Sequence, residues 1–160
     1  LEFWLYCDIK FTMSDKIHIP NISKYTIEII DNTLILTPKD VFITEDDLYK
    51  TNLGKSKIIS CIVKNGTDII SSTQKYRTIL NDIWMNMPTQ LILQNTTFNM
   101  KLTDEKGLNG YNWDSILKLS IQNKDSNGTM KEIIKMLKIN NYNIVIHIKL
   151  EDGAEIKFKI

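Results

Sequence analysis

The clearest pattern in the chain is the alternation of apolar and polar residues at its end. The segments NYNIVIHIKL and AEIKFKI are separated by Glu151-Asp152-Gly153, which is typical of a turn. Alternation with a period of two predicts a β-hairpin that buries one face. The predicted buried face consists of Ile144, Ile146, Ile148, Leu150, Ile156, Phe158 and Ile160, and the other face of Val145, His147, Lys149, Lys157 and Lys159.

Further strands are predicted along the chain. The stretch KYTIEIIDNTLILTP indicates a second hairpin, because Asp31-Asn32 tolerates the positive φ of a tight turn. The runs KIISCIVKNG and TTFNMKLTDEKG each predict one strand, and LNGYNW a loop. SILKLSIQ contains no glycine, proline or aspartate, so residues 115–122 are interpreted as one continuous strand.

Helical spacing marks two principal amphipathic helices. Residues 71–88 place apolar side chains three and four positions apart, with Ser72 or Thr73 as the N-cap and Pro88 at the end. The second helix is MKEIIKMLK, capped by Thr129, and shorter helices are predicted after Thr44 and after Pro88. The apolar stripe of the first helix consists of Tyr76, Ile79, Leu80, Ile83, Trp84 and Met87.

This order of elements favours an α+β fold. We expect a mainly antiparallel sheet with the two principal helices packed on one side of it. No linker rich in glycine, proline or serine divides the chain, so residues 21–160 are predicted to form a single domain. Residues 1–20 are interpreted as an N-terminal extension, whose first twelve residues precede a natural-looking start at Met13 and can derive from an upstream reading frame.

The composition excludes several classes of protein. Apolar residues make up 42% and charged residues 24%, as in globular domains. No apolar run approaches the roughly 18 residues that span a bilayer, and the first residues lack the features of a signal peptide. The formal net charge is +1, so no global field attracts a polyanion. These features predict an intracellular protein without a membrane segment.

One constellation has the residue types of a metal-dependent nuclease. Enzymes with a PD-(D/E)xK pattern bring an acid and an acid-x-Lys or Gln-x-Lys pair together around a divalent ion. Asp114, Gln122 and Lys124 supply these residue types, and a helix follows them. A continuous strand from 115 to 122 would separate the ends by roughly 26 Å, which is too far for a shared metal. Asp104 or Glu105 could replace Asp114, so the nuclease hypothesis stays open as an alternative.

Other candidate sites are weaker. His147, Lys149, Lys157 and Lys159 form a modest basic face for nucleic acid, although a strand face with lysines is also an ordinary solvated surface. Tyr111 and Trp113, with Trp84, are the candidate interaction residues, because aromatic residues are enriched in interfaces. Packing in the core is the favoured interpretation of Trp84.

The sequence gives little support for a metal site, a cofactor site or a covalent modification. Cys7 and Cys61 are too few for a metal cage, His18 and His147 are isolated, and no cofactor is expected. Asn65, Asn95 and Asn127 match N-x-S/T by chance in an asparagine-rich chain. Asn52 to Ser56, NLGKS, lacks the first glycine of a phosphate-binding loop and precedes a strand instead of a helix.

A resemblance adds an expectation about origin. The segments KYRTILNDIWMNMP, FNMKLTDEKGLNGYNWDSILKLSIQNKDSNGTMKEIIKML and IHIKLEDGAEIKFKI resemble uncharacterised proteins of amoeba-infecting giant DNA viruses with AT-rich genomes. The abundance of Ile, Asn and Lys beside one alanine, Ala154, and one arginine, Arg77, is typical of AT-rich codons. The resemblance implies a viral protein in the host cytoplasm or the virion, and no activity or functional residue.

Two functions are therefore expected. The first is a small non-enzymatic protein that binds itself or another protein. The alternative is a protein that binds or cleaves nucleic acid through the Asp114 constellation or the basic face.

Overall fold

The computed structural model describes residues 22–31, 33–101 and 110–160. Their elements are α-helices and mostly antiparallel strands, which confirms the α+β class. The chain separates into two units, residues 1–41 and 42–160, and each is described by itself. Residues 1–20, including Cys7 and His18, lie outside the described part. The predicted single domain over residues 21–160 stays a prediction.

The first unit contains the hairpin expected around Asp31. After a short 3-10 helix, Ile22–Lys24, strands β1 (Tyr25–Ile30) and β2 (Thr33–Pro38) pair antiparallel, with Ile27 opposite Leu36 and Ile29 opposite Leu34. Asp31 has a φ of 50°, as a two-residue hairpin turn requires. No described side chain of this unit is buried.

The second unit is built on a five-stranded sheet. Its order is β3-β10-β9-β4-β5, in which β3 and β10 are parallel and the other neighbours antiparallel. The predicted hairpin at the end of the chain is confirmed, with Ile156 opposite Ile148 and Phe158 opposite Ile146. The strands are β3 (Phe42–Ile43), β4 (Lys57–Asn65), β5 (Asp68–Ser71), β9 (Asn143–Lys149) and β10 (Glu155–Lys159).

Four α-helices accompany this sheet: α1 (Glu45–Lys50), α2 (Tyr76–Met85), α3 (Thr89–Asn95) and α4 (Ser126–Asn140). The prediction of Ser72 or Thr73 as the cap of α2 is wrong. Strand β5 extends to Ser71, and the helix begins only after Lys75, which occupies the N-cap position. Thr129 is likewise not the cap of α4, because Asp125 accepts the Gly128 N–H at 2.7 Å and the helix begins at Ser126.

A second, three-stranded sheet has the order β6-β8-β7, with β6 (Met100–Lys101), β7 (Tyr111–Asp114) and β8 (Leu119–Gln122). Two predictions are corrected here. Residues 111–113 form a strand instead of a loop, and residues 115–122 are not one strand. The chain reverses before Leu119, where Lys118 takes a φ of 56° without a glycine.

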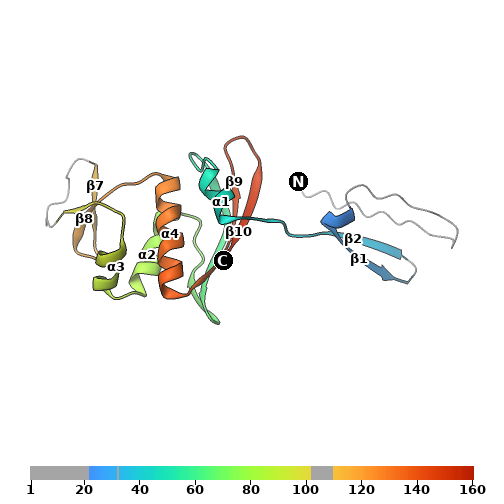
Figure 1. Cartoon of the computed structure of the whole chain (residues 1–160), viewed down its shortest axis with the longest axis horizontal. Coiled ribbons are helices and arrows are strands. Elements are labelled where there is room, and N and C mark those ends of the chain that lie inside the picture. The colour runs from blue at the N-terminus through green and yellow to red at the C-terminus, as the bar shows by residue number, and fades with distance from the viewer. Residues whose placement is uncertain (1–21, 32, 102–109) are drawn as a thin grey trace. The chain divides into compact units, whose positions relative to one another are not determined.

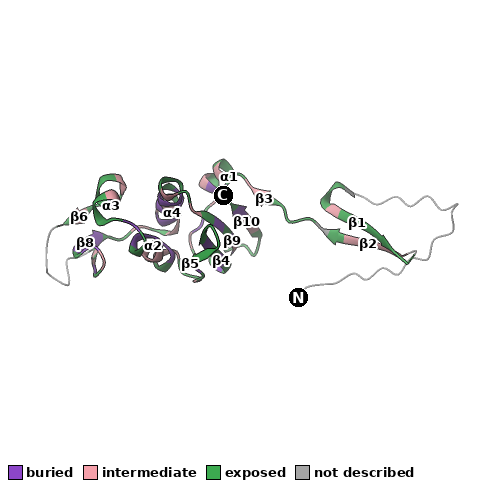
Figure 2. Ribbon diagram, turned by 90° about the horizontal axis from the view of Figure 1, so that it is seen from below, coloured by how far each residue is buried: buried purple, intermediate pink, exposed green. Residues whose placement is uncertain are grey.

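The core of the second unit lies around α2 and α4, which Figure 1 shows side by side between the two sheets. Both principal helices thus cover one side of the five-stranded sheet, as predicted. Ile144, Ile146 and Ile148 face inward from β9, and Trp84 is completely buried on α2. Figure 2 shows this buried layer and the exposed outer side of the strands.

Candidate functional site

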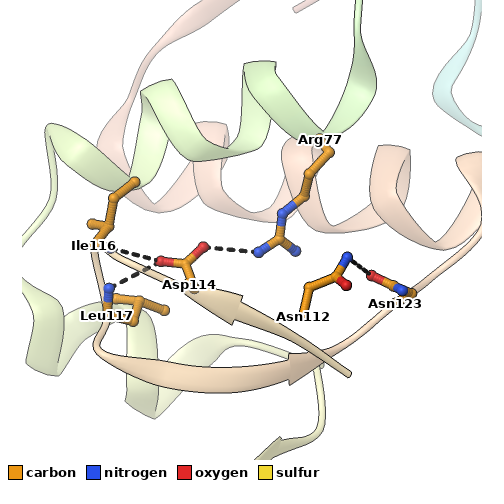
Figure 3. A network of polar contacts seen from close by, with 6 residues as sticks. All are labelled: Arg77, Asn112, Asp114, Ile116, Leu117 and Asn123. Atoms are coloured by element: carbon orange, nitrogen blue, oxygen red, sulfur yellow. Dashed lines mark hydrogen bonds and ion pairs between the residues drawn. The ribbon is translucent and has the colours of Figure 1, made fainter. Parts of the chain in front are cut away.

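Asp114 lies at the end of β7 and closes the turn into β8. Its Oδ1 accepts hydrogen bonds from the N–H groups of Ile116 and Leu117, both at 3.0 Å. Its Oδ2 accepts a hydrogen bond from Arg77 at 2.9 Å, as Figure 3 shows. The Asp114 side chain is only 3% exposed, and all of these contacts are structural. The Asp114 carboxylate therefore links the turn between β7 and β8 to helix α2.

Arg77 has further contacts besides this ion pair. Its Cζ lies 4.9 Å from the centre of the Trp84 ring and 5.3 Å from that of Phe98. Trp84 and Phe98 also meet edge to face, with ring centres 5.8 Å apart. The single arginine of the chain is thus held between a carboxylate and two aromatic rings.

Gln122 does not join Asp114 at a common point. In the β7–β8 hairpin Asp114 is opposite Leu119, and Gln122 is opposite Tyr111 at the other end. Three residues of strand separate the two positions by about 10 Å. The Gln122 Oε1 accepts instead from Asn99 at 2.6 Å. Asp114 and Gln122 therefore do not meet around a shared metal, but the reason differs from the predicted one. The chain does reverse between them, and the register of the β7–β8 hairpin places them at opposite ends of it.

Lys124 is packed rather than free. Its Nζ donates to Thr97 Oγ1 at 2.6 Å and lies 4.6 Å from the centre of the Phe98 ring. Thr97 Oγ1 in turn donates to the buried carboxylate of Glu132 at 2.6 Å. Among the described residues, no group of three or more His, Cys, Asp or Glu could hold a metal. Asp114, Gln122 and Lys124 thus do not form one site, because each side chain binds a different partner.

The aromatic candidates differ in exposure. Trp84 is buried and cannot contact a partner at the surface, which agrees with the core interpretation. Tyr111 and Trp113 are half-buried on β7, on the same face, and the Lys101 Nζ lies 4.6 Å from the centre of the Tyr111 ring. These two side chains remain accessible for an interaction.

The basic face is partly neutralised. The His147 Nε2 lies 2.9 Å from Glu155 Oε2, and Lys157 is opposite His147 on β10. The Lys159 Nζ lies 4.3 Å from the centre of the Phe42 ring. The sheet adds two lysines to this face from β4, since Lys57 is opposite Lys149 and Lys64 is opposite Asn143.

A hollow of about 570 Å³ is lined by cationic residues that are far apart in the sequence. Lys57, Lys75, Arg77 and Lys124 line it, and no acidic residue does. The wall also includes four residues that carry a hydroxyl group: Ser56, Tyr76, Ser126 and Thr129. Sequence reasoning missed this hollow, because β4, α2 and the start of α4 meet only in the tertiary structure.

Asn127 shows how the loop before β4 is held beside this hollow. Its Oδ1 accepts from Leu53 N at 2.9 Å, and its Nδ2 donates to Thr51 O at 2.7 Å. Asn127 therefore has a structural role in place of the glycosylation that its tripeptide suggests. The NLGKS stretch ends in Ser56, whose hydroxyl lies 2.8 Å from that of Tyr76.

Burial and neighbouring charges shift several pKa values. Burial raises the pKa of the Cys61 thiol to about 12, and burial also raises that of Tyr76. Burial and a hydrogen bond to Glu45 raise the pKa of Tyr49. Hydrogen bonds from Lys138 and then Tyr49 lower the pKa of Glu45. A buried thiol that is hard to deprotonate is a poor nucleophile, which fits Cys61 as a core residue.

No family model, no curated protein and no solved structure matches this chain. None of the described helices is long and apolar enough to cross a membrane.

Proposed function

We propose that this protein is a non-enzymatic binding protein that associates with a second copy of itself through strand β2. The supporting observation is the exposed apolar surface of the β1–β2 hairpin. Ile27 is 45% exposed and Ile29 is 74% exposed, and both lie on the same face as Leu34 and Leu36. A two-stranded hairpin is only marginally stable alone in water, so a further contact would stabilise it.

The backbone of β2 offers a free edge for such a contact. Lys39 N donates to Lys24 O at 2.7 Å, so these two opposite residues form a hydrogen-bonded pair. Hydrogen-bonded and non-hydrogen-bonded pairs alternate along an antiparallel hairpin, so the N–H and C=O groups of Leu34 and Leu36 point away from β1. In the described part of the chain no third strand pairs with this sheet. Four backbone groups are thus oriented for pairing with another strand.

The sequence of β2 favours a second copy as the partner. Thr33 to Thr37, TLILT, is uncharged and reads the same in both directions. Antiparallel pairing centred on Ile35 would match Thr with Thr and Leu with Leu around a twofold axis. The same arrangement on β1 would place Glu28 opposite Glu28 and is disfavoured. Pairing also joins the apolar faces of two copies, and such contiguous apolar area is typical of protein contacts.

Size-exclusion chromatography with light scattering tests this association on the full chain. The wild type is expected to be a dimer, and Ile35→Lys a monomer, since two lysines would meet at the centre of the pairing. Within the hairpin Glu28 is opposite position 35, so the new lysine gains an acidic neighbour and the hairpin is preserved.

Thr26→Lys is the matched control, because it adds the same charge to the same hairpin face on β1 and should leave the dimer intact. A monomeric wild type would contradict self-association. A dimer that persists in Ile35→Lys would contradict pairing through β2.

Nucleic-acid binding is the second candidate, and the clustering of lysines on the outer sheet face favours it. Lys57, Lys64, Lys149, Lys157 and Lys159 share this face with His147. Phosphate contacts release counterions, so binding to a single-stranded oligonucleotide should weaken steeply with salt. Lys149→Gln with Lys159→Gln should reduce both the affinity and the salt dependence in fluorescence anisotropy. Binding that does not change with salt would exclude this candidate.

A further inference from the structure

We propose that the hollow beside Lys75, Arg77 and Lys124 binds a small phosphorylated molecule through its phosphate or diphosphate group. The three cations come from the start of α2 and the segment before α4, and the wall contains no acid. Asp125, the acid next to Lys124, is occupied by the Gly128 N–H at 2.7 Å. Like charges that lie close together repel one another, and a bound anion relieves this repulsion.

The cations are oriented without being neutralised completely. Arg77 donates from one nitrogen to Asp114, which fixes the guanidinium and leaves further N–H groups to donate. Lys124 is held by Thr97 and Phe98, and its stem packs on the first turn of α4, where a Cβ on Gly128 would lie 3.1 Å from the Lys124 Cδ. Lys75 forms no ion pair with a described residue. Lys57 also borders the hollow, but it is opposite Lys149 and so lies on the outer sheet face. Two fixed cations and one adaptable cation therefore line the hollow beside the helix starts.

The placement of these charges contradicts the usual preferences of helix ends. An N-cap is normally Ser, Thr, Asp or Asn, and acidic residues favour the first turn. Helix α2 instead has Lys75 at the N-cap without a side-chain cap, and no acid in its first turn. Helix α4 has no acid in its first turn either. Local rules are commonly broken at binding sites, so these features support the site that Lys75, Arg77 and Lys124 define.

The chemistry of the wall selects the ligand class. Arginine and lysine together donate to several oxygens at once, which suits the terminal oxygens of a phosphate better than a single carboxylate. Ser126 contributes a hydroxyl group on the side of α4, whereas the Thr129 hydroxyl donates to Lys124 O. The cations converge on a hollow instead of following a long track, so a small molecule fits better than a nucleic-acid strand.

Isothermal titration calorimetry of the full chain with inorganic phosphate and with pyrophosphate tests the site. We expect saturable binding of both, tighter for pyrophosphate. Lys75→Gln should weaken it by about tenfold or more, because the change removes a hydrogen bond between charged groups. Lys75 is not part of the core, so folding should be retained, and circular dichroism checks this.

The control variant, Lys64→Gln, removes the same charge from the outer sheet face and should bind like the wild type. The site is overturned if neither anion binds saturably, or if the Lys75 variant binds like the wild type. It is also overturned if only the control variant loses affinity, since the anion would then occupy the sheet face. Binding that weakens in Lys75→Gln and in Lys124→Gln, and not in the control variant, supports it.

Discussion

At the scale of single residues, the polar side chains that looked chemical in the sequence serve structure. Asp114 was a candidate metal ligand, and it closes a turn and holds Arg77. Asn127 matched a glycosylation tripeptide, and it anchors the loop before β4. Burial explains these roles, because a buried polar group must find partners and the nearest backbone groups supply them.

Replacing Asp114 should lower the free energy of unfolding in a graded way. Asp114→Ala removes the acceptor for Ile116 and Leu117 and the partner of Arg77, and we expect a loss of about 2 to 4 kcal/mol. Asp114→Asn keeps an oxygen for the two N–H groups and should lose less. Urea denaturation measures both, with the exposed Asp68→Ala as the control. Equal losses in the Ala and Asn variants would show that the ion pair, and not the turn, dominates.

The sequence could not reveal these contacts for a geometric reason. The Arg77 and Asp114 side chains are separated by 37 positions, and Lys124 and Thr97 by 27. No periodic pattern relates such positions. By contrast, the buried face of β9 was predicted residue by residue, since alternation along one strand is a local property.

At the scale of elements, helix ends show where local rules do and do not hold. Thr44 caps α1 as predicted, accepting from Asp47 N at 3.1 Å. Lys75 occupies the N-cap of α2 although Ser72 and Thr73 are close in sequence. Pairing of β5 with β4 extends to Ser71 and delays the start of the helix, so sheet formation outweighs the better cap.

A better cap on α2 should stabilise the protein and weaken anion binding. Lys75→Ser adds a side-chain oxygen for the first N–H groups of the helix, and we expect a gain of about 1 kcal/mol in the free energy of unfolding. Thermal unfolding without phosphate measures this gain, and calorimetry the loss of affinity. Thr78→Ser, further into the helix, is the control. A destabilised Lys75→Ser variant would contradict the cap assignment.

The contact between α1 and α4 should depend on pH. The Glu45 Oε2 lies 2.5 Å from the Lys138 Nζ, and this bond lowers the pKa of Glu45 below its usual 4.5. Because the native pKa is lowered, the stabilisation is complete above the unfolded pKa and is lost as the pH falls through the native value. Glu45→Gln should therefore destabilise by less than about 1 kcal/mol at neutral pH.

The same comparison at low pH checks the sign. Urea midpoints of the wild type and Glu45→Gln should converge as the pH falls through the lowered native pKa of Glu45. A difference that persists there would mean that the variant perturbs packing and not charge.

At the scale of the whole molecule, the two units differ in how much they bury. Within the described residues, the hydrophobic core extends from Leu48 to Phe158 and contains no residue of the first unit. The described residues of the first unit bury no side chain. The second unit should thus fold without the first, whereas the hairpin needs a further surface.

The fragment 42–160 tests this division. We expect its thermal midpoint within about 4 °C of the full chain, the shift that about 1 kcal/mol causes in a domain of this size. It should be monomeric and should still bind pyrophosphate, because the hollow lies wholly within it. Light scattering and calorimetry measure both properties. An unfolded fragment would show that residues 1–41 contribute to the core.

The α+β class, the hairpins β1–β2 and β9–β10, and the buried faces of the principal helices and of β9 could all be predicted from the residues alone. Periodicity and turn residues act over a few positions, so a local pattern carries this information. The hairpin of residues 111–122 could not be predicted in this way, since Lys118 adopts a positive φ that its residue type does not indicate. The approach of Lys75 and Arg77 to Lys124 also depends on the tertiary structure, because the convergence of separate elements follows from how their apolar faces pack together.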